Sequence, residues 1–83
     1  MFSPYYSHDD FTQLCVLGDL DTIRRVYLNL ENVNARSTTG YIPLIETIKF
    51  RQLETTAFLI LNAGANVNVY DKDDYTPIFY AIS

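Results

Sequence analysis

Two stretches of the sequence hold residues of the kinds that bind metal ions. The first, near the N-terminus, contains His8, Asp9, Asp10 and Cys15. The second, "DKDDYTPIFYAI", has Asp71 at its first position and Asp73 at its third. Aspartates at these two positions are typical of a calcium-binding loop. Both stretches therefore have to be tested against the full requirements of a metal site.

Neither stretch fits a metal site. A calcium loop needs glycine at its sixth position and a bidentate glutamate at its twelfth, where this chain has Thr76 and Ile82. We interpret the acidic residues there as a solvated hairpin tip. Cys15 lies on the apolar face of a predicted helix, and free cysteine is among the most buried residue types, so we expect it in the core. His8 is expected to lie exposed beside a helix cap. The sequence predicts no metal and no cofactor.

Catalysis has no visible apparatus either. The chain has one histidine and one cysteine, and it lacks a glycine-rich phosphate loop and a Ser-His-Asp or Cys-His arrangement. We therefore expect no enzyme. The net charge of −4 argues against nucleic acid or an anionic membrane as the main partner, since both are bound largely through Lys and Arg.

The totals describe one folded domain. The chain has 83 residues, of which 48% are hydrophobic and 19% charged. Its longest apolar run, residues 57–61, is far shorter than the ~20 residues of a membrane span. A single cysteine cannot form an internal disulfide, and "MFSPYYSHDD" has no secretory pattern, so we expect an intracellular protein.

Apolar residues at helical spacing predict two helices in the first third of the chain. The first follows Ser7, a plausible N-cap with Asp10 three residues later, and stops near Gly18. The second starts at Asp19 or Asp21 and turns its apolar residues to one side. Together they predict a helical hairpin.

Three more helices are predicted in the remaining chain. The third and the fifth open at Pro43 and Pro77, because the first turn of a helix tolerates a missing N–H. The fourth runs from about residue 54 to 63 and ends at Gly64 as its left-handed cap. It is apolar nearly all round, so we expect both of its sides to be covered.

A repeat underlies this order of helices. Pro43 and Pro77 stand 34 residues apart, as do Val33 and Val67, and "GDLDTIRRVYLNL" aligns with "RQLETTAFLILNA" at an offset of 33. A helical repeat of this length narrows the choice of architecture sharply. The segments "GANVN" and "TPIFYA", and the full copy "STTGYIPLIETIKFRQLETTAFLILNAGANVN", resemble the ankyrin repeat family. The resemblance covers about residues 9 to 83.

The resemblance implies an all-α fold, an ankyrin-repeat α-solenoid whose helix-turn-helix units are joined by β-hairpin-like loops. Residues 1–8 would be an N-terminal extension, 9–36 a degenerate N-terminal capping repeat, 37–70 a full repeat and 71–83 an incomplete third repeat. In "GANVN", Ala65 and Val67 would pack under the loop, while Asn66 and Asn68 would bond to neighbouring repeats.

Several positions depart from the family pattern. Ile42 replaces the family's threonine, Ile45 and Phe79 replace its histidine, and Asp74 stands where Gly40 keeps the hairpin glycine. These turns must then depend on apolar packing. Such drift suggests a divergent natural repeat, of the kind found in intracellular bacteria and large DNA viruses.

By resemblance, the function is protein–protein binding through the hairpin tips and the concave face of the first helices. The partner is a protein, and the positions that would contact it are Arg36, Thr38, Thr39, Tyr41, Lys49, Tyr70, Lys72, Asp73 and Tyr75. The alternative is a truncated remnant of a longer ankyrin repeat protein with no independent function. Because no capping repeat follows the last predicted helix, we expect the uncapped C-terminal end of the repeat stack to be open to self-association.

Overall fold

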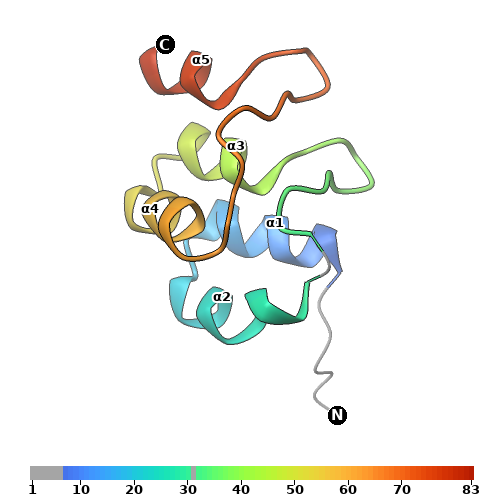
Figure 1. Cartoon of the computed structure of the whole chain (residues 1–83), viewed down its shortest axis with the longest axis vertical. Helices are drawn as coiled ribbons and strands as arrows, with labels where there is room; N and C mark the ends of the chain where they lie inside the picture. Colours follow the sequence, from blue (N-terminus) through green and yellow to red (C-terminus); the bar gives the residue numbers. More distant parts are fainter. Residues whose placement is uncertain (1–6, 31) are drawn as a thin grey trace.

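The computed structural model describes residues 7–30 and 32–83. Its helices follow the predicted order, with a short 3₁₀ helix, η1, added after the second: α1 His8–Leu17, α2 Leu20–Val26, η1 Tyr27–Asn29, α3 Pro43–Lys49, α4 Leu53–Leu61 and α5 Pro77–Ile82. The described residues contain no β-strand. The first helices α1, α3 and α5 pack in succession, and the loops before α3 and α5 project to one side (Figure 1). Figure 1 therefore shows a stack of helical units, as an α-solenoid requires.

The ends of α1 form as the sequence predicts. The Ser7 hydroxyl accepts a hydrogen bond from the Asp10 N–H at 3.1 Å, and the Asp10 carboxylate accepts one from the Ser7 N–H at 3.4 Å. At the other end Gly18 has a φ of 71°, the left-handed conformation that glycine adopts without strain. The carboxyl end of α1 is also tied to the next repeat, because Gln52 Nε2 donates to the Val16 carbonyl at 2.9 Å.

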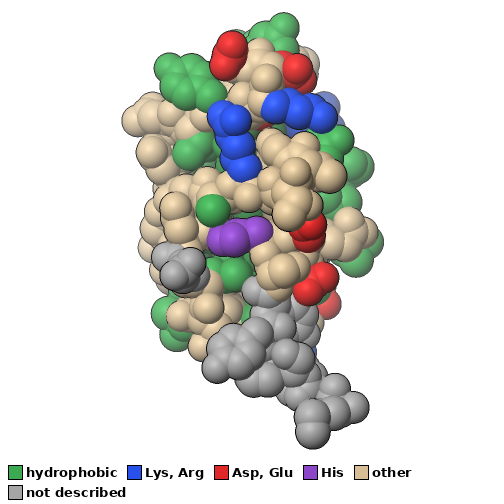
Figure 2. All heavy atoms as spheres, turned by 90° about the vertical axis from the view of Figure 1, so that its right-hand side faces the viewer, with side chains coloured by type: hydrophobic (Ala, Val, Ile, Leu, Met, Phe, Trp, Pro, Cys, Tyr) green, Lys and Arg blue, Asp and Glu red, His purple; other side chains and the backbone are tan. Residues whose placement is uncertain are grey.

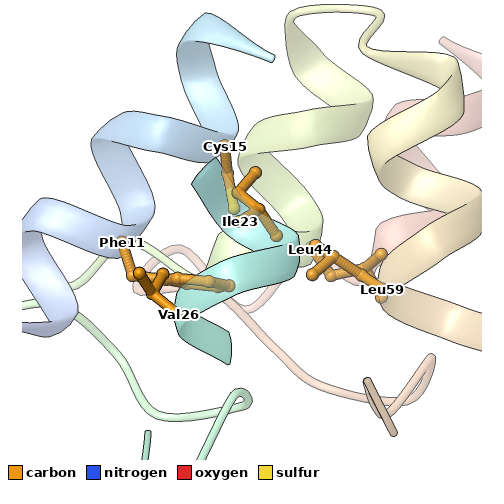
Figure 3. Packing of buried hydrophobic residues seen from close by; sticks show 6 residues of the cluster. All are labelled: Phe11, Cys15, Ile23, Val26, Leu44 and Leu59. Carbon is orange, nitrogen blue, oxygen red and sulfur yellow. The ribbon is translucent and has the colours of Figure 1, made fainter. Parts of the chain in front are cut away.

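The hydrophobic core joins the first helical pair to the second (Figure 3). Its buried members come from α1, α2, α3 and α4 and are Phe11, Cys15, Ile23, Val26, Leu44 and Leu59. The ring of Tyr27 meets that of Phe58 edge to face, with 5.1 Å between centroids, a favourable aromatic geometry. The prediction that Cys15 belongs to the core is confirmed.

The prediction that both sides of α4 are covered is wrong. Only Thr55 and Leu59 of this helix are buried, whereas Leu53, Ile60 and Leu61 are exposed. In the described part of the chain α5 packs against α3, and the outer side of α4 is left largely exposed. Although α4 is apolar nearly all round, only one of its sides packs against the rest of the protein.

The asparagines after α4 also differ from the expectation. Asn34, one repeat earlier, makes the link between repeats: its Oδ1 accepts from the Asn66 N–H at 2.6 Å and its Nδ2 donates to the Gly64 carbonyl at 3.4 Å. The Asn66 side chain instead bonds locally, accepting from the Asn68 N–H at 2.9 Å. Ala65 packs against the core as predicted, but Val67 is about half exposed.

Candidate protein-interaction surface

Two equivalent hairpins form the projecting edge of the molecule. In the first, residues 37–41, the Ser37 N–H donates to the Tyr41 carbonyl at 2.7 Å. In the second, residues 71–75, the Asp71 N–H donates to the Tyr75 carbonyl at 2.9 Å. Gly40 has a φ of 88°, and its counterpart Asp74 has a φ of 66°. Asp74 thus keeps the glycine's left-handed conformation, which aspartate adopts more easily than most residues.

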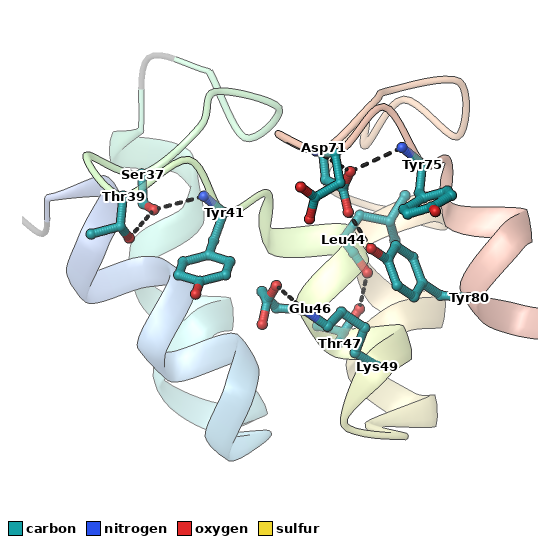
Figure 4. Close-up of polar contacts among 11 residues, drawn as sticks. Ser37, Thr39, Tyr41, Leu44, Glu46, Thr47, Lys49, Asp71, Tyr75 and Tyr80 are labelled. Carbon is teal, nitrogen blue, oxygen red and sulfur yellow. Dashed lines mark hydrogen bonds and ion pairs between the residues drawn. The ribbon is translucent and has the colours of Figure 1, made fainter. Parts of the chain in front are cut away.

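Buried side chains at the base hold each hairpin in shape (Figure 4). Ser37 Oγ accepts from the Tyr41 N–H at 3.0 Å. Asp71, only 7% exposed, does the same with two oxygens: its Oδ1 accepts from the Asp73 and Tyr75 N–H groups, both at 2.9 Å, and its Oδ2 accepts from the Tyr80 hydroxyl. These contacts use the oxygens that the calcium-loop interpretation would have assigned to an ion.

The Asp71–Tyr80 contact shifts the pKa of both groups. Burial acts to raise the pKa of Asp71, but the hydrogen bonds from Tyr80, Tyr75 and Asp73 outweigh it, so the pKa lies below its usual value. The carboxylate in turn raises the pKa of Tyr80 to about 12, because its hydrogen bond favours the protonated phenol. At neutral pH the pair is an aspartate bonded to a neutral tyrosine.

Tyr41 links the two hairpins. Tyr41 is 38% exposed, and the Nζ of Lys72, on the second hairpin, lies 4.8 Å from the centroid of its ring. The Nζ of Lys49, on α3, lies 5.6 Å from the same ring and 5.4 Å from that of Tyr80. Cation–π contacts at such exposed sites contribute about 0.5–1 kcal/mol each. Lysines and tyrosines of two repeats thus form one continuous patch.

A second buried acid lies beside this patch. Glu46, in α3, is 5% exposed, and its Oε1 lies 3.3 Å from Lys49 Nζ. The ion pair keeps the Lys49 side chain over the face of α3 and leaves part of it open to solvent. Glu46 and Tyr80 stand 34 residues apart, so equivalent positions of successive repeats approach Lys49 from either side.

A groove runs between α1, the first hairpin and α3. Its volume is about 460 Å³, and the residues that line it include Gln13, Val16, Thr39, Tyr41, Glu46, Lys49 and Phe50. Figure 2 shows the molecule from the side of the projecting loops, where basic side chains lie between acidic ones above and below them. The groove therefore offers apolar surface within a mixed polar and charged rim, as protein interfaces do.

Three of the predicted contact residues bind other parts of the chain. Arg36 donates from Nη2 to the carbonyls of Tyr70 and Asp71, at 2.8 and 3.4 Å. Thr38 donates to the carboxylate of Asp9 from its N–H at 2.7 Å and from its hydroxyl at 2.5 Å, and these bonds lower the pKa of Asp9. The Thr39 hydroxyl lies 3.1 Å from that of Ser37.

The other predicted residues lie at the surface without forming a single cluster. Tyr41 and Lys49 line the groove, and Lys72 bridges to it. Tyr75 stacks on Phe79 with 4.1 Å between centroids, and the exposed Tyr70 and Asp73 side chains lie elsewhere on the second hairpin and its approach.

The contact prediction did not include Glu46, Asp71 and Tyr80. The sequence signal that could have found them is the offset of 34, which pairs Ser37 with Asp71 and Glu46 with Tyr80. Within residues 7–30 and 32–83, no helix is long and apolar enough to cross a membrane. The same residues show no group of three or more His, Cys, Asp or Glu placed to hold a metal ion.

Comparison with known proteins agrees with this repeat architecture. No family model matches the chain. A fowlpox virus (strain NVSL) protein, FPV230, described as an ankyrin repeat protein, is 30% identical over 63 residues, which cover 76% of this chain. The chain spans about a third of that relative's length, 33%. The similarity, the helical stack and the recurring hairpins confirm the all-α ankyrin solenoid expected from the motifs. The chain belongs to the ankyrin repeat family.

Proposed function

We propose that the chain binds a protein partner along the hairpin tips and the groove beside α3. Ankyrin repeats are in general protein-interaction modules and not enzymes, so a protein partner is the natural starting point. The observation that carries the proposal is the groove of about 460 Å³, where Val16, Tyr41 and Phe50 meet the polar rim. A segment of a partner that buries these apolar groups gains hydrophobic free energy, while the rim supplies hydrogen bonds.

Tyr41 is the proposed anchor of this contact. Its ring is partly exposed, and Lys49 and Lys72 on either side limit its motion, so a partner would order it at little entropic cost. Both lysines also retain N–H groups that can donate to carbonyls or carboxylates of the partner. Lys72 and Tyr75 would extend the contact to the second hairpin, together with Tyr70 and Asp73.

The remaining candidates have a supporting role in this proposal. Arg36, Thr38 and Thr39 hold the first hairpin through the hydrogen bonds to Tyr70, Asp9 and Ser37 described above. Their replacement would weaken binding by displacing Tyr41, without loss of a direct contact. The repeat division at residues 36/37 and 70/71 is part of the proposal, and the matching hairpins at 37–41 and 71–75 support it. We also propose an intracellular location.

The test is a binding measurement with a matched control. A partner is identified by affinity capture from cell extract, and its dissociation constant is then measured with purified proteins by isothermal titration calorimetry. We expect Tyr41→Ala to weaken binding at least tenfold, as loss of an anchor residue does. Leu28→Ala removes an exposed apolar side chain far from the groove and should leave the affinity unchanged. Equal affinity of wild type and Tyr41→Ala would refute the proposed surface.

A further inference from the structure

A second groove, in large part apolar, lies between α4 and α5. Two adjoining hollows form it, of about 560 and 310 Å³, and both are lined by Ile48 and Ala81. The apolar part of the rim consists of Leu53 and Ile60 of α4, Val67 of the loop after it, and Pro77 and Ile78 of α5. The larger hollow is also lined by polar and charged residues, among them Lys49, Arg51 and Tyr80. Leu53 is 76% exposed. Monomeric proteins rarely expose large contiguous apolar patches, so this groove suggests an interface.

The preceding repeat shows what shape of partner such a groove accepts. The residues 33 or 34 positions before the groove residues include Leu14, Leu20, Ile23, Tyr27, Val33 and Leu44, and all of them belong to the core or pack against it. There α4 supplies the cover: its Leu59 is fully buried, and its Phe58 meets the ring of Tyr27. The groove between α4 and α5 therefore has the lining that an apolar helix like α4 covers one repeat earlier.

The exposed side of α4 is itself such a surface. Leu53, Ala57 and Ile60 follow one another at i, i+4 and i+7, so they form a stripe along the outside of the helix. The small Ala57 at the middle of the stripe allows a second helix to approach closely. The stretch 55–70 contains no charged residue, so the stripe itself is uncharged, and the charged residues that line the groove are Lys49 and Arg51.

We propose that a second copy of the chain covers this groove, and that the α4 stripe of each copy lies in the α4–α5 groove of the other. A two-fold arrangement uses the same face of both copies and closes the assembly at a dimer. The antiparallel crossing of the two α4 helices places one Ala57 near the other and each Leu53 toward the far end of the partner helix. The two surfaces meet at Lys49, but the apolar residues of this groove are not among those proposed to bind a protein partner, so the inference does not depend on the proposed function.

Sedimentation equilibrium over a range of protein concentrations tests the dimer. We expect the wild type to pass reversibly from monomer to dimer with a micromolar dissociation constant. Leu53→Glu places a charge in the interface and should weaken dimerisation at least tenfold, while its position in the first turn of α4 suits an acidic residue. Leu28→Glu is the matched control, because Leu28 is 79% exposed outside the groove, and it should dimerise as the wild type does.

A cysteine at the crossing point supplies a second readout. Ala57→Cys should form a disulfide-linked dimer under mild oxidation, whereas Leu28→Cys should not, and the buried Cys15 should not take part. A wild type that stays monomeric throughout would overturn the proposal. So would equal effects of Leu53→Glu and Leu28→Glu, or growth beyond the dimer, which indicates open head-to-tail stacking.

Discussion

Ser37 and Asp71, 34 residues apart, hold two successive hairpins by the same two contacts. Each donates its N–H to the carbonyl four residues later, at 2.7 and 2.9 Å, and each accepts the N–H of that residue on a side-chain oxygen, at 3.0 and 2.9 Å. The carboxylate does more than the hydroxyl, because it has oxygens to accept from Asp73 and Tyr80 as well. Asp71 is therefore the main polar support of the second hairpin.

Replacement of Asp71 should destabilise the protein by an amount that depends on whether the new side chain still accepts a hydrogen bond. Asp71→Ala leaves the N–H groups of Asp73 and Tyr75 without their partner, and we expect a loss of about 1–3 kcal/mol in the free energy of unfolding. Asp71→Ser retains one acceptor, as at Ser37, and should lose less. Urea denaturation followed by circular dichroism measures both. Asp73→Ala, at an exposed neighbour, is the control, and an equal loss there would contradict this role.

Stability should fall in acid through the same carboxylate. The folded pKa of Asp71 is lowered, and so is that of Asp9. Such a group stabilises the folded state above its unfolded pKa, about 3.9, and that contribution is lost as the pH falls through the lower folded pKa. We expect the urea midpoint of unfolding of the wild type to decrease as the pH is lowered below about 4. Asp71→Ser should show a shallower drop, and an identical pH profile would exclude Asp71 as a cause.

Tyr80 should titrate later than an ordinary tyrosine. Its pKa of about 12 exceeds the usual value near 10. The hydrogen bond between Tyr80 and Asp71 therefore stabilises the folded state below pH 10, and this stabilisation is lost as the pH rises through about 12. An alkaline titration followed by tyrosinate absorbance should show a late step that belongs to Tyr80. Tyr80→Phe should abolish this step, and Asp71→Asn should move it to lower pH. A late step that survives Tyr80→Phe belongs to another residue.

Cys15 gives a direct measure of whether the repeats form a cooperative domain. The thiol is fully buried, and burial raises its pKa to about 12, so it should resist thiol reagents in the folded state. Its modification rate should follow global unfolding, with the same urea midpoint as circular dichroism. A cooperative unfolding transition with the same midpoint by both measurements favours an interaction module. Fast labelling without denaturant would favour the alternative of a truncated remnant with no independent function.

The sequence predicts most of the fold, because local signals determine the helix ends. The Ser7 cap, Gly18 and the prolines at 43 and 77 all occupy the predicted places. The exposure of α4 could not be predicted, because an apolar helix does not reveal how many neighbours it has. Contacts between repeats could not be predicted either: Arg36 and Thr38 look like free surface residues in the sequence, but Arg36 binds the Tyr70 carbonyl and Thr38 binds Asp9 of α1.

Arg51 should be the easiest position at which to stabilise the chain. It stands 33 residues after Gly18, in the equivalent turn between helices, and keeps a left-handed φ of 57° with a side chain attached. This conformation costs a residue other than glycine roughly 1–2 kcal/mol, so Arg51→Gly should raise the free energy of unfolding by up to about 1 kcal/mol once the added chain entropy of glycine is deducted. Gly18→Ala should act in the opposite direction, because alanine is strained at a φ of 71° and its Cβ would displace the Gln52 side chain, which donates to the Val16 carbonyl. Thermal and urea unfolding of the two variants measure both changes in the free energy of unfolding. If Arg51→Gly lowers stability, the Arg51 side chain makes a contribution larger than its backbone strain.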